Sequence, residues 1–183
     1  MKKLAIFLFF FVQIFALPAL ARDYQIELLV FEPKNPSSES EEQWNAGSNQ
    51  ILADQESMRG IAVAAVNLPL QKGVSRLKRI ESELLSSGYR LLVSTSWPQP
   101  AEVYQRAPIV NISRSDNKLI GFLKVYKTSL IFVDVNLGLV DALIDPVLPT
   151  FFISEKRRVK FKEVHYFDHP KFGAILTVWP VEE

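Results

Sequence analysis

The sequence contains no cysteine and only two histidines among its 183 residues. The absence of cysteine excludes disulfide bonds, thiol catalysis, disulfide exchange and metal sites with thiolate ligands. The folded chain must therefore be stabilised by its core alone. Both histidines lie within one short segment, "EVHYFDHPKFG" at 163–173, so any imidazole chemistry is confined to that segment.

The sequence has a single long apolar run, and this run is short for a membrane span. Leu4–Leu17 is almost wholly apolar, whereas a spanning helix needs roughly 20 such residues. Lys2 and Lys3 precede the run, and Ala19 and Ala21 occupy the small-residue positions of a cleavage site. These features predict a signal peptide at 1–21 and a periplasmic protein without a membrane span after cleavage. No cysteine follows the site, which excludes a lipoprotein.

The sequence also lacks a strong net charge. The mature chain, 22–183, has 19 Lys and Arg (21 less Lys2 and Lys3) against 20 Asp and Glu, a formal charge of −1. This balance gives no electrostatic attraction to nucleic acid, and we expect none as a partner. The length is that of one domain with a substantial core.

Hydrophobic periodicity predicts the first elements of the mature chain. Apolar residues alternate in "YQIELLVFEP" at 24–33, which is typical of a half-buried strand. The polar stretch at 33–50 predicts a mobile loop, and residues 51–72 a short helix followed by a linker. An apolar stripe at helical spacing predicts an amphipathic helix over 74–87, with Gly88 as its C-terminal cap in the left-handed conformation.

The rest of the chain is rich in strand patterns. A strand is expected from Tyr89 until Pro98 and Pro100 end it. Residues 117–141 predict a β-hairpin with its turn at 127–129. Three further strands are expected, in "TFFISEKRRV", "KEVHYF" and "GAILTVW". With no internal repeat, these patterns predict a single α+β domain, a mainly antiparallel β-sheet with one or two helices packed on it.

Three short motifs match those of penicillin-binding proteins and serine β-lactamases in type and order. They are Ser75-x-x-Lys78, Ser115-Asp116-Asn117 and Lys127-Thr128-Ser129. Their spacing argues against this chemistry, because the third motif follows the second by only 10 residues and falls at a predicted hairpin turn. A penicillin-sensitive acyl-serine enzyme is therefore a remote alternative.

The histidine segment admits several interpretations. In a strand His165 and His169 share a face but lie about 13 Å apart, too far for one ion, and a metal would also need carboxylate ligands. A structural interpretation makes Asp168 the start of a turn, with its carboxylate accepting hydrogen bonds from nearby backbone N–H groups. A ligand-facing edge is the other interpretation that the segment leaves open. No cofactor is expected.

A basic run, "EKRRVKFK", precedes the histidines. Its five cations are Lys156, Arg157, Arg158, Lys160 and Lys162. Such a run can be a solvated hairpin edge that discourages aggregation. It can also bind carboxylates, because the arginine side chain donates two parallel hydrogen bonds, and peptidoglycan stem peptides are the polymeric carboxylates of the envelope. Aromatic rings that could contact sugar faces follow closely: Tyr166, Phe167, Phe172 and Trp179.

These segments together resemble the CsiV family of periplasmic peptidoglycan-binding proteins of gammaproteobacteria. The similar segments are the signal peptide, "YQIELLVFE", "YRLLVSTSWPQP", "DVNL" and "SEKRRVKFKEVHYFDHPKFGAILTVWP". The last is the most specific, with paired arginines, E-x-H-Y and then D-H-P-x-F-G. The chain departs from the family at "TSLIFVDVNL", which lacks an aromatic–His pair entering the second hairpin strand, and residues 33–72 are unmatched.

The resemblance implies a non-enzymatic periplasmic protein that binds peptidoglycan and supports cell-wall synthesis and cell shape. It also implies lipoprotein activators of penicillin-binding proteins as partners. An adaptor that binds only proteins is the alternative. The matching positions carried over as candidate ligand-binding residues are Trp97, Gln99, Arg157, Arg158, Glu163, His165, Tyr166, Asp168 and His169. Pro170, Phe172 and Gly173 complete the matched segment.

Overall fold

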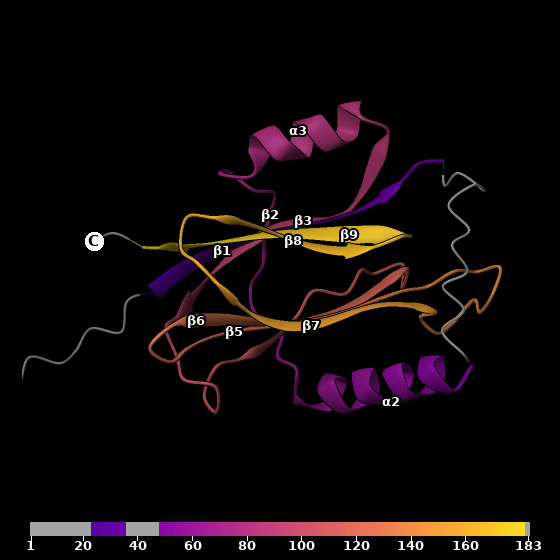
Figure 1. The fold of residues 1–183 in the computed structure, drawn as a ribbon, viewed down its shortest axis with the longest axis horizontal. Helices are drawn as coiled ribbons and strands as arrows, with labels where there is room; N and C mark the ends of the chain where they lie inside the picture. The colour runs from indigo at the N-terminus through magenta and orange to yellow at the C-terminus, as the bar shows by residue number, and fades with distance from the viewer. Residues whose placement is uncertain (1–22, 36–47, 182–183) are drawn as a thin grey trace, which may run out of the picture.

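The protein folds as two antiparallel β-sheets packed face to face, with one helix outside each sheet (Figure 1). The computed structural model describes residues 23–35 and 48–181. The predicted signal peptide and most of the predicted loop at 33–50 lie outside the described residues. The prediction of a single, mainly antiparallel α+β domain with helices packed on it is confirmed, with the strands divided between two sheets.

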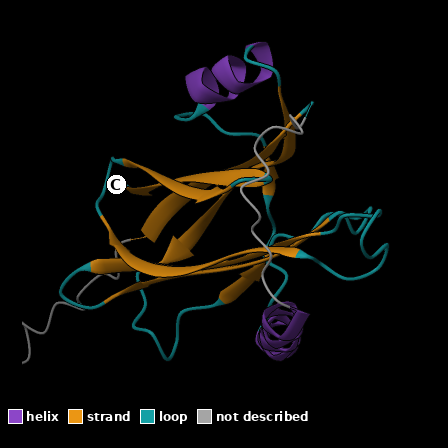
Figure 2. Ribbon diagram, turned by 45° about the vertical axis from the view of Figure 1, so that its right-hand side comes forward, coloured by secondary structure: helices purple, strands orange, loops and turns teal. Residues whose placement is uncertain are grey.

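Sheet A has five strands and sheet B has four. In spatial order sheet A consists of β2 (Gln71–Lys72), β3 (Tyr89–Pro100), β1 (Asp23–Pro33), β9 (Phe172–Pro180) and β8 (Val164–His169). Sheet B consists of β4 (Ile109–Asn111), β5 (Leu119–Lys127), β6 (Ile131–Leu139) and β7 (Phe151–Val159). The helices are α2 (Ser48–Ala64), outside sheet B, and α3 (Lys78–Ser86), outside sheet A (Figure 2).

The main core fills the space between the sheets. The predicted hairpin is β5 and β6, and its alternating apolar residues all face this core, as in Ile131, Val133 and Val135, which are at most 4% exposed. Alternate residues of β1 face it from the other side, including Ile26 and Leu28. Period-two patterning in both sheets thus produces one shared apolar layer.

The outer face of sheet A carries a second, smaller core. Leu29, Phe31 and Ile175 pack there against Leu77 and the apolar stripe of α3. The strand β1 is therefore buried on both faces, which corrects the prediction of a half-buried strand. The helix begins at Lys78 rather than at residue 74, and Gly88 has the predicted left-handed conformation, with a φ of +85°.

A buried glutamate on β1 holds the entry to α3. The carboxylate of Glu27 is 1% exposed and accepts hydrogen bonds from the backbone N–H groups of Ser75, Arg76 and Leu77 at 2.9–3.1 Å. It also accepts one from the Ser75 hydroxyl at 2.7 Å. These donors precede the helix and would otherwise lack partners. The Ser75 hydroxyl is therefore engaged by Glu27, while Lys78 pairs with Glu81 at 2.6 Å.

Two predictions about local structure need correction, although Pro100 does end β3 as predicted. The strand β3 continues through Pro98, which lies opposite Gln25, and ends at Pro100. Its other neighbour, β2, reaches only Thr95 and Ser96, so beyond Ser96 β3 is an edge strand and a proline there costs no ladder hydrogen bond. Residues 51–72 also hold more structure than expected, because α2 extends to Ala64 and β2 follows it.

The basic run does not form a hairpin edge, because its two flanking strands belong to different sheets. The strand β7 pairs with β6 in sheet B, and β8 pairs with β9 in sheet A. The connection at 160–163 therefore crosses from one sheet to the other. The histidine segment itself forms the β8–β9 hairpin, in which His169 lies opposite Phe172.

Candidate functional site

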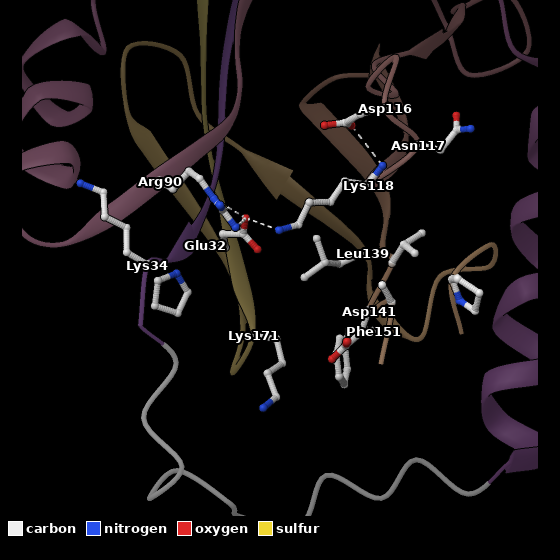
Figure 3. A pocket seen from close by; sticks show the side chains of 14 residues that line it. Glu32, Lys34, Arg90, Asp116, Asn117, Lys118, Leu139, Asp141, Phe151 and Lys171 are labelled. Carbon is white, nitrogen blue, oxygen red and sulfur yellow. Dashed lines mark hydrogen bonds and ion pairs between the residues drawn. The ribbon is translucent and has the colours of Figure 1, made fainter. Parts of the chain in front are cut away.

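Strand ends from both sheets surround a cavity of about 560 Å³ at one end of the sandwich (Figure 3). We call this cavity the end pocket. Its charged lining consists of four cationic and three acidic side chains: Lys34, Arg90, Lys118, Lys171, Glu32, Asp116 and Asp141. Its apolar lining includes Leu139, Val140, Ala142, Pro146 and Phe151. The end pocket thus combines charges of both signs with an apolar wall.

The end pocket is organised around Glu32, a 7% exposed residue near the end of β1. Its Oε1 accepts hydrogen bonds from Arg90 Nε at 2.8 Å and Lys118 Nζ at 2.7 Å, and Arg90 Nη2 lies 2.6 Å from the same oxygen. Its Oε2 has no hydrogen-bond partner among the described residues. Figure 3 shows this second oxygen turned away from both cations and toward the open part of the pocket.

A second acidic residue of the lining is neutralised locally. Asp116 accepts hydrogen bonds from Arg114 Nε at 2.9 Å and Nη2 at 2.6 Å. These bonds lower the pKa of Asp116 to about 2. Arg114 also donates to the carbonyl of Leu92, which fixes the pair in place. The Ser115-Asp116-Asn117 motif lies in the turn just before β5, and Lys127-Thr128-Ser129 lies at the other end of that strand, which spans about 26 Å.

The rim of the end pocket carries further charges. Lys171 projects from the β8–β9 turn, and Asp141 and Phe151 lie across from it, whereas the Lys34 side chain is directed away from the other charged groups (Figure 3). The Asp141 carboxylate accepts a hydrogen bond from the backbone N–H of Leu143 at 3.0 Å. The cations that face the pocket are therefore Arg90, Lys118 and Lys171.

His169 fixes the turn that carries Lys171. Its ring lies between Phe151 and Phe172, with centroids 5.5 Å from each, and its Nδ1 accepts a hydrogen bond from the backbone N–H of Lys171. Burial, together with the Lys171 cation, lowers the pKa of His169 against the opposing effect of Asp168. The neutral ring is therefore favoured, which suits an Nδ1 acceptor.

The predicted turn-capping role of Asp168 is wrong. The Asp168 carboxylate accepts a hydrogen bond from the Tyr166 hydroxyl at 2.6 Å, and the side chain that binds a backbone N–H of the turn is His169. Burial and this bond raise the pKa of Tyr166. Tyr166 and Asp168 point to the outer face of sheet A, where Tyr166 stacks on Phe31, so neither lines the end pocket.

The two histidines lie at opposite ends of β8. His165 is near the start, where its Nε2 lies 3.1 Å from the backbone N of Lys160 and braces the connection at 160–163. Glu163 pairs with Lys160 in the same connection, at 3.2 Å. Across residues 23–35 and 48–181, no three His, Asp or Glu side chains gather as potential metal ligands.

The paired arginines have different environments. Arg157 faces the interior, where its guanidinium lies 4.0 Å from the Phe167 ring centroid, donates to the Tyr166 carbonyl and pairs with Glu155 at 3.1 Å. Arg157 therefore links β7 of sheet B to β8 of sheet A. Arg158 is exposed on the outer face of sheet B, and its side chain has no hydrogen bond or ion pair to the described part of the chain.

Trp97 and Gln99 are core residues, 0% and 2% exposed. The Trp97 Nε1 donates to Gln99 Oε1 at 3.1 Å, and Gln99 Nε2 donates to the Val125 carbonyl of sheet B at 2.9 Å. The pair links the two sheets through the core. A ligand at the surface does not reach either side chain in this conformation, although both were predicted as candidate ligand contacts.

A second concave surface lies beside α3. It is an open groove of about 820 Å³ lined by Lys72, Arg76, Lys78 and Trp179, among others. The Arg76 guanidinium covers the Trp179 ring at 4.7 Å from its centroid, and the Lys162 ammonium lies 5.4 Å from it. The indole that was expected to contact sugars is thus already in contact with two cations.

The nine predicted candidates do not form one site. Trp97 and Gln99 are buried, Arg157 and His165 hold the β7–β8 connection, and only His169 supports the end pocket. The pocket residues Glu32, Arg90, Lys118 and Lys171 were not predicted, because they are far apart in the sequence and each is an ordinary surface-type residue. Of these four residues, only Lys171 lay in a segment that the sequence had marked as a candidate site, "DHPKFG".

Comparison with protein-family models, with curated proteins and with solved structures found no match to this chain.

Proposed function

We propose that this protein is a non-enzymatic periplasmic accessory protein that binds peptidoglycan and supports cell-wall synthesis and cell shape. We place the binding of peptidoglycan stem peptides in the end pocket. The sequence features that support the proposal are the expected signal peptide and the resemblance to the CsiV family. No helix in the described part of the chain is long and apolar enough to cross a membrane.

The observation that carries the proposal is the convergence of three cations on one cavity with an apolar wall. Arg90, Lys118 and Lys171 come from three different segments of the chain and all line the end pocket. Stem peptides carry several carboxylates on a partly aliphatic backbone, and charge-assisted hydrogen bonds from Lys and Arg bind such groups. The "DHPKFG" segment, the most specific part of the resemblance, supplies Lys171 to this pocket.

The geometry of the acyl-serine motifs argues against the acyl-serine alternative. An acyl-serine mechanism needs the serine hydroxyl beside its lysine. Here the Ser75 hydroxyl donates to Glu27, and the Lys78 ammonium binds Glu81. The other two motifs lie at opposite ends of β5. Lipoprotein activators of penicillin-binding proteins are the protein partners that the resemblance suggests, and we propose them as such.

Co-sedimentation with purified sacculi tests the proposal. The mature chain should pellet with sacculi, and the Lys118→Gln/Lys171→Gln double variant should bind at least about tenfold more weakly, because each lost charge-assisted hydrogen bond is worth about 1.5–3 kcal/mol. Binding should also weaken as salt rises, because exposed charges are screened within about 10 Å at 0.1 M. The Arg79→Gln/Arg106→Gln double variant is the matched control, because it removes two exposed cations outside the pocket.

Thermal melts of each variant should accompany this measurement, since Lys118 also pairs with Glu32. A folded double variant that pellets like the wild type would remove the end pocket from the proposal. A wild-type chain that stays in the supernatant, but is recovered with envelope proteins, would favour the adaptor alternative instead.

A further inference from the structure

We infer that the end pocket selects a zwitterionic peptide end, one that carries an ammonium and a carboxylate on the same carbon. The free end of a diaminopimelate residue in a peptidoglycan stem is such a group. This inference rests on the proposed function and names the part of the stem that is bound. It follows from how the charges of the pocket are paired with one another.

The acceptor for the ammonium is Oε2 of Glu32. Both cations on this carboxylate use the other oxygen, with three nitrogen–oxygen distances of 2.6–2.8 Å to Oε1. Oε1 is thereby saturated, while Oε2 has no partner in the described part of the chain. A carboxylate accepts about four hydrogen bonds, so Oε2 retains its acceptor capacity and faces the cavity (Figure 3).

The donors for the carboxylate are the cations of the same pocket. Lys118 uses one of its ammonium protons on Glu32 and retains two for a ligand. Lys171 has no ion pair with a described residue, and His169 fixes its backbone. Arg90 adds a guanidinium with further donors. The pocket therefore offers positive groups on either side of one free carboxylate oxygen.

This arrangement disfavours ligands of a single charge sign. A purely anionic group that approaches Lys118 also approaches Oε2 of Glu32, and a purely cationic group approaches Arg90 and Lys118. A zwitterionic end places one charge against each, so both of its charges are compensated in a partly buried site. The apolar wall, with Leu139 and Phe151, accommodates the aliphatic chain that joins this end to the rest of the peptide.

Three synthetic peptides separate the two charges. The first is L-Ala-γ-D-Glu-meso-diaminopimelate, which has the zwitterionic end. The second has L-lysine in place of diaminopimelate and so lacks the carboxylate of the zwitterionic end. The third has the same sequence as the first, with the amine of the zwitterionic end of diaminopimelate acetylated. Calorimetric titration of the wild type should give the tightest binding for the first and about tenfold weaker binding for each of the others, one charge-assisted bond being lost.

Two variants should each remove one of the two preferences. Glu32→Gln should abolish the preference for the free over the acetylated amine and keep the preference for diaminopimelate over lysine. Lys171→Gln should weaken the preference for diaminopimelate over lysine and keep the preference for the free amine. Melting temperatures identify a Glu32→Gln chain that fails to fold, in which case the wild-type comparison, which needs no variant, decides.

The outcomes distinguish this inference from the proposed function. Equal affinities for the three peptides would overturn the inference and leave peptidoglycan binding intact. Sacculus binding without binding of any stem peptide would also overturn it and assign recognition to another part of the polymer. Absence of binding to both sacculi and peptides would contradict the proposed function itself.

Discussion

Replacing Glu27 by alanine is expected to lower the free energy of unfolding by about 3–4 kcal/mol, which is about 10 °C in melting temperature for a domain of this size. The carboxylate is 1% exposed and satisfies three backbone N–H groups and one hydroxyl at the entry to α3. Alanine would leave these donors without their acceptor and would loosen the helix from sheet A. Differential scanning calorimetry measures the loss.

The contribution of the Glu27 carboxylate to the free energy of unfolding should decrease at acidic pH. Burial alone raises the pKa of Glu27, but the hydrogen bonds from Ser75, Arg76 and Leu77 outweigh it, so the pKa in the folded state lies below the ordinary value of 4.5. The carboxylate therefore contributes its stability above pH ~4.5, and the contribution is lost as pH falls through the folded-state pKa. The stability difference between wild type and Glu27→Gln should narrow in this acidic range.

Glu27→Gln is the control that keeps the shape of the Glu27 side chain and removes its charge. Its amide oxygen can still accept, but its NH₂ group faces N–H donors, so we expect a loss smaller than that of alanine but well above 1 kcal/mol. A Glu27→Ala chain that melts within about 2 °C of the wild type would show that water satisfies these donors and that the carboxylate does not anchor α3.

Trp97→Ala is expected to cost about 3–5 kcal/mol, the range for truncating a large buried aromatic side chain. Trp97 is 0% exposed, and its loss also removes the hydrogen bond to Gln99 that leads on to sheet B. Trp97→Phe keeps most of the ring volume and should cost less. Chemical denaturation followed by circular dichroism measures both.

The phenylalanine variant also separates a core role from ligand contact. If Trp97 acts only in the core, folded Trp97→Phe should bind sacculi like the wild type, because the side chain lies away from the end pocket. Reduced sacculus binding by a Trp97→Phe chain of wild-type stability would contradict this placement and return Trp97 to the candidate ligand contacts.

Local periodicity was sufficient to predict much of the secondary structure. The alternation in Ile131, Val133 and Val135 identified a strand and its buried face, and Gly88 identified the end of a helix, because both depend on neighbours in the sequence. The division of the strands into two sheets was not predictable in this way. The partners of β7 and β8 are chosen by long-range packing, and a basic turn between two strands has the same local pattern whether or not those strands pair.

The same limit applied to the candidate site. Glu27 has the pattern of the polar member of an alternating strand, yet it is buried because the segment that leads into α3 places N–H donors above it. Glu32 lies on β1, Arg90 on β3 and Lys118 just before β5, and only the folded chain brings them together. The histidine segment was correctly identified as a strand–turn–strand edge, but the roles of Asp168 and His169 in its turn depended on the contacts of Tyr166 and Phe151.

The most direct test of the central claim is to locate the bound stem on the protein. Backbone amide spectra of the ¹⁵N-labelled mature chain should be recorded during titration with a disaccharide tripeptide released from sacculi. Shifts should concentrate at the end pocket, at the amides of Lys118, Val140, Phe151 and Lys171, and should be small in the connection at 160–163. Shifts confined to that connection or to the groove beside α3, with the amides of the end pocket unchanged, would contradict the claim that the end pocket binds the stem peptide.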